Sequence, residues 1–232
     1  MSPLPLVYTT RSDCEPEYLE RKEKWYAERH VPDLIAVGFH SAQSVHSEIG
    51  TPFVCNVYEI PGTDIFLSQA YKHTRTNDPQ RPEVLSKMSN LSAAVYEQVL
   101  LCLPPDRITP AADSPAAAIT GPCLTTVRFD IRKGTEPRFV EWYRREEFPR
   151  LLHARGFAAG RLCRQGPRHP TLATSDPEWM VLLEWESTAT ARADGSLEDI
   201  VRRHEQPLPG ALSRLAYNLL RRVFRLAREP HA

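Results

Sequence analysis

The chain reads WYAERHVPDLIAVGF from Trp25 to Phe39 and WYRREEFPRLLHARGF from Trp142 to Phe157. The second stretch begins 117 positions after the first, and six landmarks recur in the same order: Trp, Tyr, Pro, Leu, Gly and Phe. One residue is inserted between the proline and the glycine of the second copy. Internal similarity at so long a period predicts two related structural units, and not a solenoid of short repeats.

The segment between the two copies differs from both in composition. Residues 104–122 read PPDRITPAADSPAAAITGP, which is rich in proline and alanine and has no amphipathic period. Such a composition is typical of a linker. We therefore expect one unit in residues 1–103 and another in residues 123–232, each within the usual domain size of roughly 50–200 residues.

Within each unit, the pattern of apolar and turn residues predicts the order β-α-β-β-α-β. Pro32 is expected to bend or end the regular part of the first helix. In the first unit we expect strands at 4–10, 39–47, 53–60 and 95–103 and helices at 15–37, 64–73 and 82–91. In the second unit we expect strands at 124–131, 157–165, 179–186 and 216–225 and helices at 136–154 and 197–204, although the basic character of 216–225 leaves a helix open there.

This order of elements is that of the ferredoxin-like split unit. Such a unit covers one face of its sheet with helices and leaves the other face bare, and the bare face must be buried against something. Two units in one chain can bury both bare faces by packing sheet to sheet. The sequence therefore predicts an α+β fold built from two ferredoxin-like units.

The first copy also resembles a known motif, W-Y-x-x-x-H-x-P-x-L followed by G-F, which is found in EthD-like and related stress-responsive domains of the dimeric α+β barrel superfamily. The resemblance implies a tandem duplication folded as a pseudo-dimeric barrel. That superfamily includes cofactor-free monooxygenases, polyketide cyclases, lactone isomerases, dehydratases and haem-binding enzymes, so the fold alone does not decide the function. The motif is carried here by Trp25, Tyr26, His30, Pro32, Leu34, Gly38 and Phe39.

His30 is the first candidate for a catalytic role. An imidazole with a pKa near ~6.5 can take or give a proton at neutral pH. In an apolar pocket it could remove an acidic C–H or O–H proton from a bound substrate. The alternative is a histidine near a helix C-terminus that interacts with the helix dipole. Glu147 stands at the corresponding position of the second copy, so only the first unit could use a histidine there.

Two further histidines, His40 and His46, are catalytic candidates on the strand that follows. Their even spacing places them on one face. Asn56 and Tyr58 alternate on the next strand and are candidates for substrate binding. If these faces look into the barrel, the four side chains line its cavity; the alternative is a solvated face or a position at the strand ends. Neither the two histidines nor any other spacing indicates a metal site.

Three more residues are candidates for substrate binding. Arg161 inside a barrel would hold a carboxylate or enolate oxygen, although the favoured interpretation is an internal ion pair of Glu184 with Arg161 or Arg128, or plain exposure to solvent. Trp25 and Tyr26 recur in the second copy, which favours core packing, but both could also form the wall of an aromatic pocket.

Composition limits the partners and the location. The formal net charge is zero, so the basic surplus of a nucleic-acid binder is missing. No apolar run approaches the ~18–20 residues of a membrane span, and the first residues lack the features of a signal peptide. The five cysteines form no CxxC pair and four of them lie in apolar runs, as expected for reduced thiols in a cytoplasmic protein.

The positions of the three candidate histidines indicate which unit is expected to be active. His30, His40 and His46 all fall in the first unit, which is therefore expected to hold the active cavity. We expect a cofactor-independent enzyme of small-molecule or secondary metabolism that transfers protons on an apolar or aromatic substrate, as a cyclase, dehydratase, isomerase or lyase does. The alternatives are a cofactor-free or haem-dependent monooxygenase of the same barrel class and a non-enzymatic barrel that binds a small ligand. Exposed strands would also allow the chain to form a homodimer.

Overall fold

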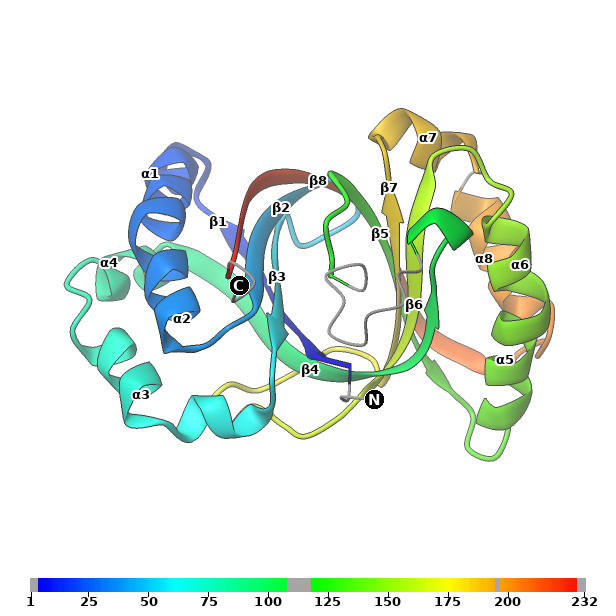
Figure 1. Ribbon diagram of the computed structural model, residues 1–232, viewed down its shortest axis with the longest axis horizontal. Coiled ribbons are helices and arrows are strands. Elements are labelled where there is room, and N and C mark those ends of the chain that lie inside the picture. Colours follow the sequence, from blue (N-terminus) through cyan, green and yellow to red (C-terminus); the bar gives the residue numbers. More distant parts are fainter. Residues whose placement is uncertain (1–3, 108–117, 195–196, 229–232) are drawn as a thin grey trace.

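A computed structural model describes residues 4–107, 118–194 and 197–228 and shows a closed barrel of eight antiparallel strands (Figure 1). Around the barrel the strands follow the order β1-β3-β2-β8-β5-β7-β6-β4. The strands are β1 (Leu6–Cys14), β2 (Ser41–Ile49), β3 (Val54–Ile60), β4 (Met88–Cys102), β5 (Cys123–Ile131), β6 (Phe157–Gln165), β7 (Trp179–Trp185) and β8 (Leu212–Ala227).

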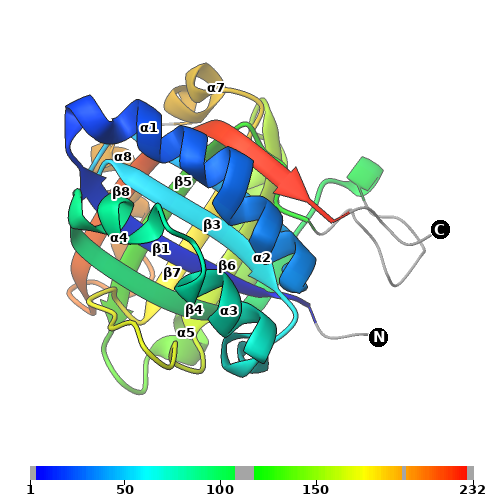
Figure 2. The same cartoon turned by 90° about the vertical axis from the view of Figure 1, so that its left-hand side faces the viewer.

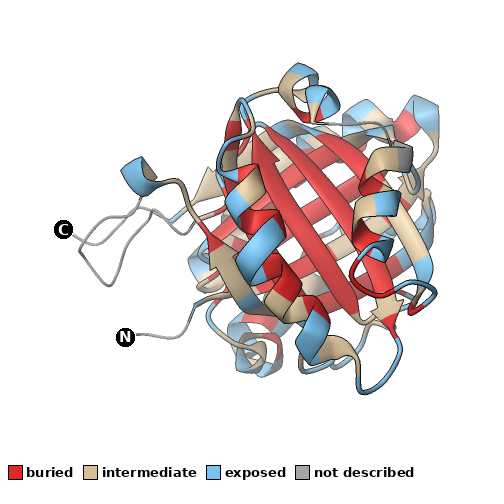
Figure 3. Ribbon diagram, turned by 90° about the vertical axis from the view of Figure 1, so that its right-hand side faces the viewer, coloured by how far each residue is buried: buried red, intermediate tan, exposed pale blue. Residues whose placement is uncertain are grey.

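The helices lie outside the barrel in two groups (Figure 1). Figure 2 shows the first group over the strands of the first half, and Figure 3 shows the second group over buried strands of the other half. The first group contains α1 (Leu19–Trp25), α2 (Val31–Val37), α3 (Gln69–Thr76) and α4 (Arg81–Ser86). The second contains α5 (Glu136–Trp142), α6 (Phe148–Leu151), α7 (Thr188–Ala193) and α8 (Leu197–Glu205).

The two halves of the chain use the same strand order. The first half gives β4-β1-β3-β2 and the second gives β8-β5-β7-β6, and the halves join where β2 pairs with β8 and where β4 pairs with β6. Both halves therefore have the β-α-β-β-α-β order that the sequence predicts, and the prediction of a mixed α+β barrel is confirmed. The final segment is a strand and not a helix, and α7 is an additional helix.

Each strand alternates between two environments, because successive side chains point to opposite faces. On β1, Val7 faces the barrel interior, where it joins a cluster with residues such as Val57, Leu124 and Leu182. Its neighbour Tyr8 faces the helices of the first half. A third cluster lies between the strands and helices of the second half. The barrel interior and the two helix-covered faces are thus three separate cores.

The long first helix of each half contains one π turn directly before its proline. A π turn spans Tyr26–His30 between α1 and α2, and another spans Tyr143–Glu147 between α5 and α6. A proline lacks a backbone N–H and its ring collides with the carbonyl four residues earlier. The wider turn accommodates Pro32, and the chain stays helical from α1 through the π turn into α2. The expected break at Pro32 is therefore a local change of helix type, and the helix does not end there. Such turns occur frequently at functional sites.

The end of the expected linker is part of the barrel. Ile119 is buried in the interior cluster, and its N–H donates to Glu59 Oε2 at 3.1 Å. The N–H groups of Thr120 and Gly121 donate to Glu184 Oε2 at 2.7 and 2.6 Å. Gly121 allows this approach, because a Cβ there would lie 2.8 Å from the Cβ of Glu184. The remainder of the expected linker, residues 108–117, lies outside the described residues.

Four of the five cysteines are buried. Cys55, Cys102, Cys123 and Cys163 are buried free thiols. Within residues 4–107, 118–194 and 197–228, no group of three His, Cys, Asp or Glu side chains could hold a metal ion. In the same part of the chain, every helix is too short or too polar to cross a lipid bilayer.

Candidate functional site

A pocket of about 110 Å³ lies between the strands of the first half and the helices that cover them. Strands β1 and β3 form its floor, and α1, the π turn, α3 and α4 form its walls. It is lined by Tyr8, Thr10, Lys22, Trp25, Tyr26, His30, Leu34, Phe39, Asn56, Tyr58, Tyr71, Arg75, Arg81, Leu85, Met88, Leu91 and Leu172.

Aromatic rings dominate this pocket. Tyr8 and Tyr58 stack with their ring centroids 5.1 Å apart, and Tyr26 lies 6.4 Å from Tyr58. Burial raises the pKa of all three phenols, and that of Tyr71, above the ordinary value of about 10. These tyrosines therefore stay protonated near neutral pH. Tyr26 donates to the carbonyl of Gln43 at 3.5 Å, and the hydroxyl groups of Tyr8, Tyr58 and Tyr71 can donate hydrogen bonds to a ligand. The lining suits a flat apolar molecule that carries a few polar atoms.

His30 lies at the end of the π turn on one side of the pocket. Its ring stacks on the indole of Trp25, with centroids 4.6 Å apart and an angle of 19°. Burial, together with the positive charges of Arg81, Lys22 and Arg75, lowers the pKa of His30 from 6.5 to about 3. The imidazole is therefore neutral at pH 7. Among the described residues, it has no hydrogen-bond partner, so its ring nitrogens are available to a molecule in the pocket.

Trp25 is itself held in place by the first half. Its indole Nε1 donates to Asp78 Oδ2 at 2.7 Å, and both residues are buried. The indole ring on which His30 stacks is therefore held in place by this hydrogen bond. This contact ties α1 to the segment between α3 and α4. Two cationic residues of the pocket lining, Arg75 and Arg81, lie on either side of that segment.

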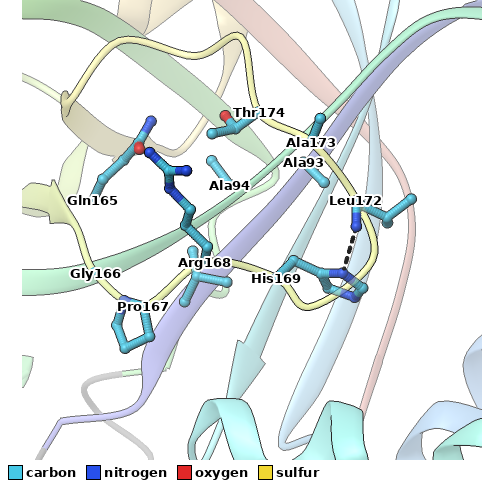
Figure 4. A pocket seen from close by; sticks show the side chains of 11 residues that line it. Ala93, Ala94, Gln165, Gly166, Pro167, Arg168, His169, Leu172, Ala173 and Thr174 are labelled. Atoms are coloured by element: carbon cyan, nitrogen blue, oxygen red, sulfur yellow. Dashed lines mark hydrogen bonds between the residues drawn. The ribbon is translucent and has the colours of Figure 1, made fainter.

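A loop from the second half covers the pocket. The segment between β6 and β7 reaches past β4 toward α3, as the yellow part of Figure 1 shows. His169 Nδ1 accepts hydrogen bonds from the N–H groups of Thr171 and Leu172 at 3.2 and 3.1 Å, the second of which is drawn in Figure 4. Because Nδ1 accepts, Nε2 carries the proton and donates to the hydroxyl of Tyr71 at 3.3 Å. Leu172 completes the lining of the pocket.

This covering loop was not expected from the sequence. The signal for it is a difference in length: residues 166–178 connect β6 to β7, whereas only residues 50–53 connect β2 to β3 at the corresponding place. Arg75 donates to Thr171 Oγ1 at 2.8 Å, and Arg11 forms an ion pair with Asp176. These contacts, together with the hydrogen bond between His169 and Tyr71, attach the loop to the first half.

The structure separates the candidate residues into two groups. His30, Trp25, Tyr26, Asn56 and Tyr58 all line the same pocket. The pocket lies on the helix-covered side of the sheet and not inside the barrel, because the interior is filled by its own cluster.

The other three candidates lie elsewhere, and their expected positions need correction. His40 precedes β2 and is exposed, so it does not share a cavity with His46. His46 faces α1 and contacts Glu23 Oε1 at 2.8 Å. Arg161 lies fully buried inside the barrel, where it pairs with Glu184, as the favoured interpretation held. A carboxylate of the chain itself therefore occupies the place at which Arg161 would have held a ligand.

The corresponding region of the second half is filled by its own side chains. Glu147, at the position of His30, is buried and pairs with Arg150 at 2.7 Å and with Arg203 at 3.4 Å. The hydroxyl of Tyr143 bonds to His204 Nε2, while His204 Nδ1 donates to the carbonyl of Ile200 at 2.7 Å. This network replaces the aromatic cavity of the first half.

The buried histidines predict an acid-labile fold. Burial lowers the pKa of His204 and of His169 from 6.5 to about 4. As the pH falls from about 6.5 to 4, the unfolded chain binds protons that the folded chain does not, so the free energy of unfolding decreases. We expect His204 alone to account for roughly 2–3 kcal/mol between pH 6.5 and 4.5.

Urea unfolding at pH 7.0, 5.5 and 4.5 measures this effect. His204→Gln should flatten the dependence on pH, whatever its effect at neutral pH, and the exposed His40→Gln should leave it unchanged. An equally steep loss of stability in the His204 variant would contradict the assignment.

Comparison with known proteins supports the fold. No family model matches the chain, and no curated protein sequence matches it. Among solved structures, an anthrone oxidase-like protein superimposes with a TM-score of 0.64 at 13% identity, covering 98% of this chain and 94% of its own. A monooxygenase-like protein from Lactobacillus acidophilus gives 0.60 at 8% identity, covering 97% of each chain. A haem-binding protein from Thermus thermophilus gives 0.52 at 12% identity, covering 96% and 92%. The chain thus has the fold of the dimeric α+β barrel class to which the monooxygenase-like proteins belong.

Proposed function

We propose that this protein is a cofactor-independent enzyme that removes a proton from an acidic C–H or O–H group of a small aromatic substrate, with His30 as the base. The observation that carries this proposal is a neutral imidazole, without a partner among the described residues, facing a pocket of aromatic rings. A base must be unprotonated at the working pH and must reach the substrate. His30 meets the first condition, and its place in the lining meets the second. Its low pKa makes it a weak base in the free pocket, and a negatively charged substrate beside Arg75 and Arg81 would raise that pKa toward the working pH.

The tyrosines of the pocket supply the second part of the mechanism. When the substrate loses its proton, negative charge develops on an oxygen of the resulting enolate or phenolate. Donors that are already oriented toward this oxygen stabilise the charge at little reorganisation cost. The hydroxyl groups of Tyr8, Tyr58 and Tyr71 lie in the lining and remain protonated, so they are the candidates for this role. The protonated His30 can then return its proton to another atom, which completes an isomerisation or cyclisation, or permits loss of a leaving group.

A second candidate function is oxidation of the same carbanion by dioxygen. Two structural neighbours, one named an anthrone oxidase-like protein and the other a monooxygenase, favour it. The balance is complete without a cofactor: a CH₂ group and O₂ give a carbonyl group and water. The first step is identical, so His30 would have the same role in both reactions.

The test follows the substrate proton directly. Anthrone and other small aromatic compounds with acidic C–H groups would be incubated with the protein in D₂O, with and without oxygen. We expect deuterium exchange at the acidic carbon under both conditions, and oxygen uptake in stoichiometric amounts only if the second candidate is correct. A Soret band after addition of haemin, absent in His30→Ala, would instead favour the haem-dependent alternative. Failure of every compound to exchange faster than in buffer would leave a ligand-binding barrel as the better description.

Further properties of the chain remain proposals. We propose that the halves arose by tandem duplication of an EthD-like unit, with residues 1–103 and 123–232 as the two copies; the repeated motif, the equal strand order and the two π turns support this. The buried free thiols support a cytoplasmic protein. Whether two chains associate would be measured by sedimentation.

A further inference from the structure

Two arginines that face the aromatic pocket have no carboxylate partner among the residues that the structure describes. Arg75 lies on α3 and Arg81 begins α4, and both are half-buried in the pocket wall. Within the part of the chain that the structure describes, neither guanidinium forms an ion pair with Asp or Glu. The two acids nearest in sequence have other partners: buried Asp78 accepts hydrogen bonds from Trp25 and from the N–H of Gln80, and Glu83 pairs with Arg21.

Other buried or partly buried arginines are held by neutral acceptors or by carboxylates, and Arg128, Arg222 and Arg225 donate to the amide of Asn218 or to backbone carbonyls. Arg11, Arg150 and Arg203, which are also partly buried, all pair with carboxylates. The lining of the pocket contains three cationic residues and no Asp or Glu, although the whole chain has no net charge. Lys22 has a counter-ion, Glu23 at 2.7 Å, whereas no ion pair of Arg75 or Arg81 occurs in the described part of the chain.

The two arginines repel each other. Burial lowers the pKa of Arg81, and the charge of Arg75 lowers it further. A partly desolvated cation without an anionic partner is unfavourable. The free pocket therefore holds unbalanced positive charge that an anionic ligand would neutralise.

The second half shows the balanced version of the same region. There, Arg150 and Arg203 surround two carboxylates, Glu147 and Asp194. Glu147 occupies the position that His30 holds in the first half. The second half thus supplies its own anions, whereas the first half presents its cations to an open pocket.

Arg75 is also oriented before any ligand binds. It donates to Thr171 Oγ1 of the covering loop at 2.8 Å, and its guanidinium lies 5.7 Å from the centroid of the Tyr71 ring. These contacts fix the guanidinium plane at the pocket wall. A fixed planar guanidinium can form paired hydrogen bonds with a carboxylate, which is a strong and directional interaction.

We propose that the substrate of this site is a small aromatic carboxylate, whose ring lies among the tyrosines and Trp25 and whose carboxylate binds between Arg75 and Arg81. The inference rests on the proposed function for the identity of the site, and it adds the substrate class. The carboxylate serves as an anchor that places the acidic C–H or O–H group of the substrate beside His30.

The test compares matched probes by isothermal titration calorimetry: 2-naphthoate, 2-naphthol and 2-naphthamide. We expect 2-naphthoate to bind at least about tenfold more tightly than the two neutral probes, on the scale of a charge-assisted hydrogen bond. Arg75→Gln and Arg81→Gln should each weaken binding of 2-naphthoate about 10- to 100-fold and leave the amide almost unaffected. Arg168→Gln is the matched control, because Arg168 is exposed and lies outside this pocket.

Thermal unfolding separates this role from a structural one. Without ligand, Arg81→Gln should leave Tm unchanged or raise it, because it removes an unbalanced charge. A drop in Tm of several degrees would show that the arginine supports the fold, and this would overturn the inference, as would equal binding of naphthoate and naphthamide. His30→Ala should still bind 2-naphthoate. A protein with arginine-dependent binding but no proton transfer would therefore disprove the proposed function and leave the carboxylate site in place.

Discussion

Replacing His30 with alanine is expected to lower turnover about 10²- to 10⁴-fold while the barrel stays folded. That range is typical for the loss of a positioned general acid or base. The change removes the one imidazole in the pocket lining and leaves the aromatic walls and the two arginines in place. The effect should therefore fall on kcat and only weakly on KM, since the ring contributes little to ground-state binding.

His40→Ala and His46→Ala are the controls for this prediction. Both residues were candidates from the sequence, and both lie outside the pocket. Near wild-type turnover in these variants would show that the position matters and not the number of histidines. His30→Ala should also stay folded with a small drop in Tm, because it loses ring contacts with Trp25 and Tyr26, each worth about 0.5–1.5 kcal/mol. Turnover within a few-fold of the wild type would remove His30 from the mechanism.

Replacing Glu184 with alanine is expected to destabilise the protein by about 3–5 kcal/mol, the usual effect of leaving one member of a buried ion pair without its partner. Arg161 and Glu184 are both fully buried inside the barrel. Glu184 also accepts the N–H groups of Thr120 and Gly121. The loss would be a large part of the total stability of a typical domain, which is about 5–15 kcal/mol.

The double variant Arg161→Met with Glu184→Leu is the informative comparison. A buried ion pair replaced by apolar side chains of similar size is often neutral or stabilising. We expect the double variant to be more stable than Glu184→Ala. A cycle with the single variants Arg161→Met and Glu184→Leu should give a coupling energy of more than about 1 kcal/mol in urea unfolding. Additive effects of the two single changes would show that the pair does not interact in the folded protein. Glu184→Gln, which keeps one carbonyl oxygen for the linker N–H groups, should lie between the wild type and the alanine variant.

The repeat and the alternation of apolar residues were sufficient to predict the fold. The β-α-β-β-α-β order and the strand ends at Phe157 and Gln165 agree with the structure, because these features depend on local pattern. The position of the pocket could be predicted only in part. His30, Trp25 and Tyr26 come together because they lie within two turns of one helix, a distance that sequence spacing determines.

The features that could not be predicted depend on contacts between segments that lie far apart in the sequence. His40 and His46 share a parity along the strand, but the strand begins only at Ser41, and parity does not say which face looks toward the barrel. His169 and Arg75 meet although they lie in different halves, and no local pattern reports such a contact. The role of Arg75 and Arg81 in the pocket was missed for the same reason, because whether an arginine has an acidic partner depends on the acids that the fold brings near it.

The burial of Ile119 inside the barrel has a consequence for experiments that divide the protein into its two halves. Ile119 sits among the interior side chains, its N–H meets Glu59, and its carbonyl accepts from Arg225 at 3.0 Å, so one short stretch is bound by a carboxylate of the first half and a guanidinium of the last strand. A fragment that ends at Leu103 would lose the buried Ile119 side chain. It would also lose β8 and β6, the strands that pair with β2 and β4. The halves therefore should not survive as separately expressed proteins, and mixing the two fragments should restore the barrel only if one of them carries residues 118–122.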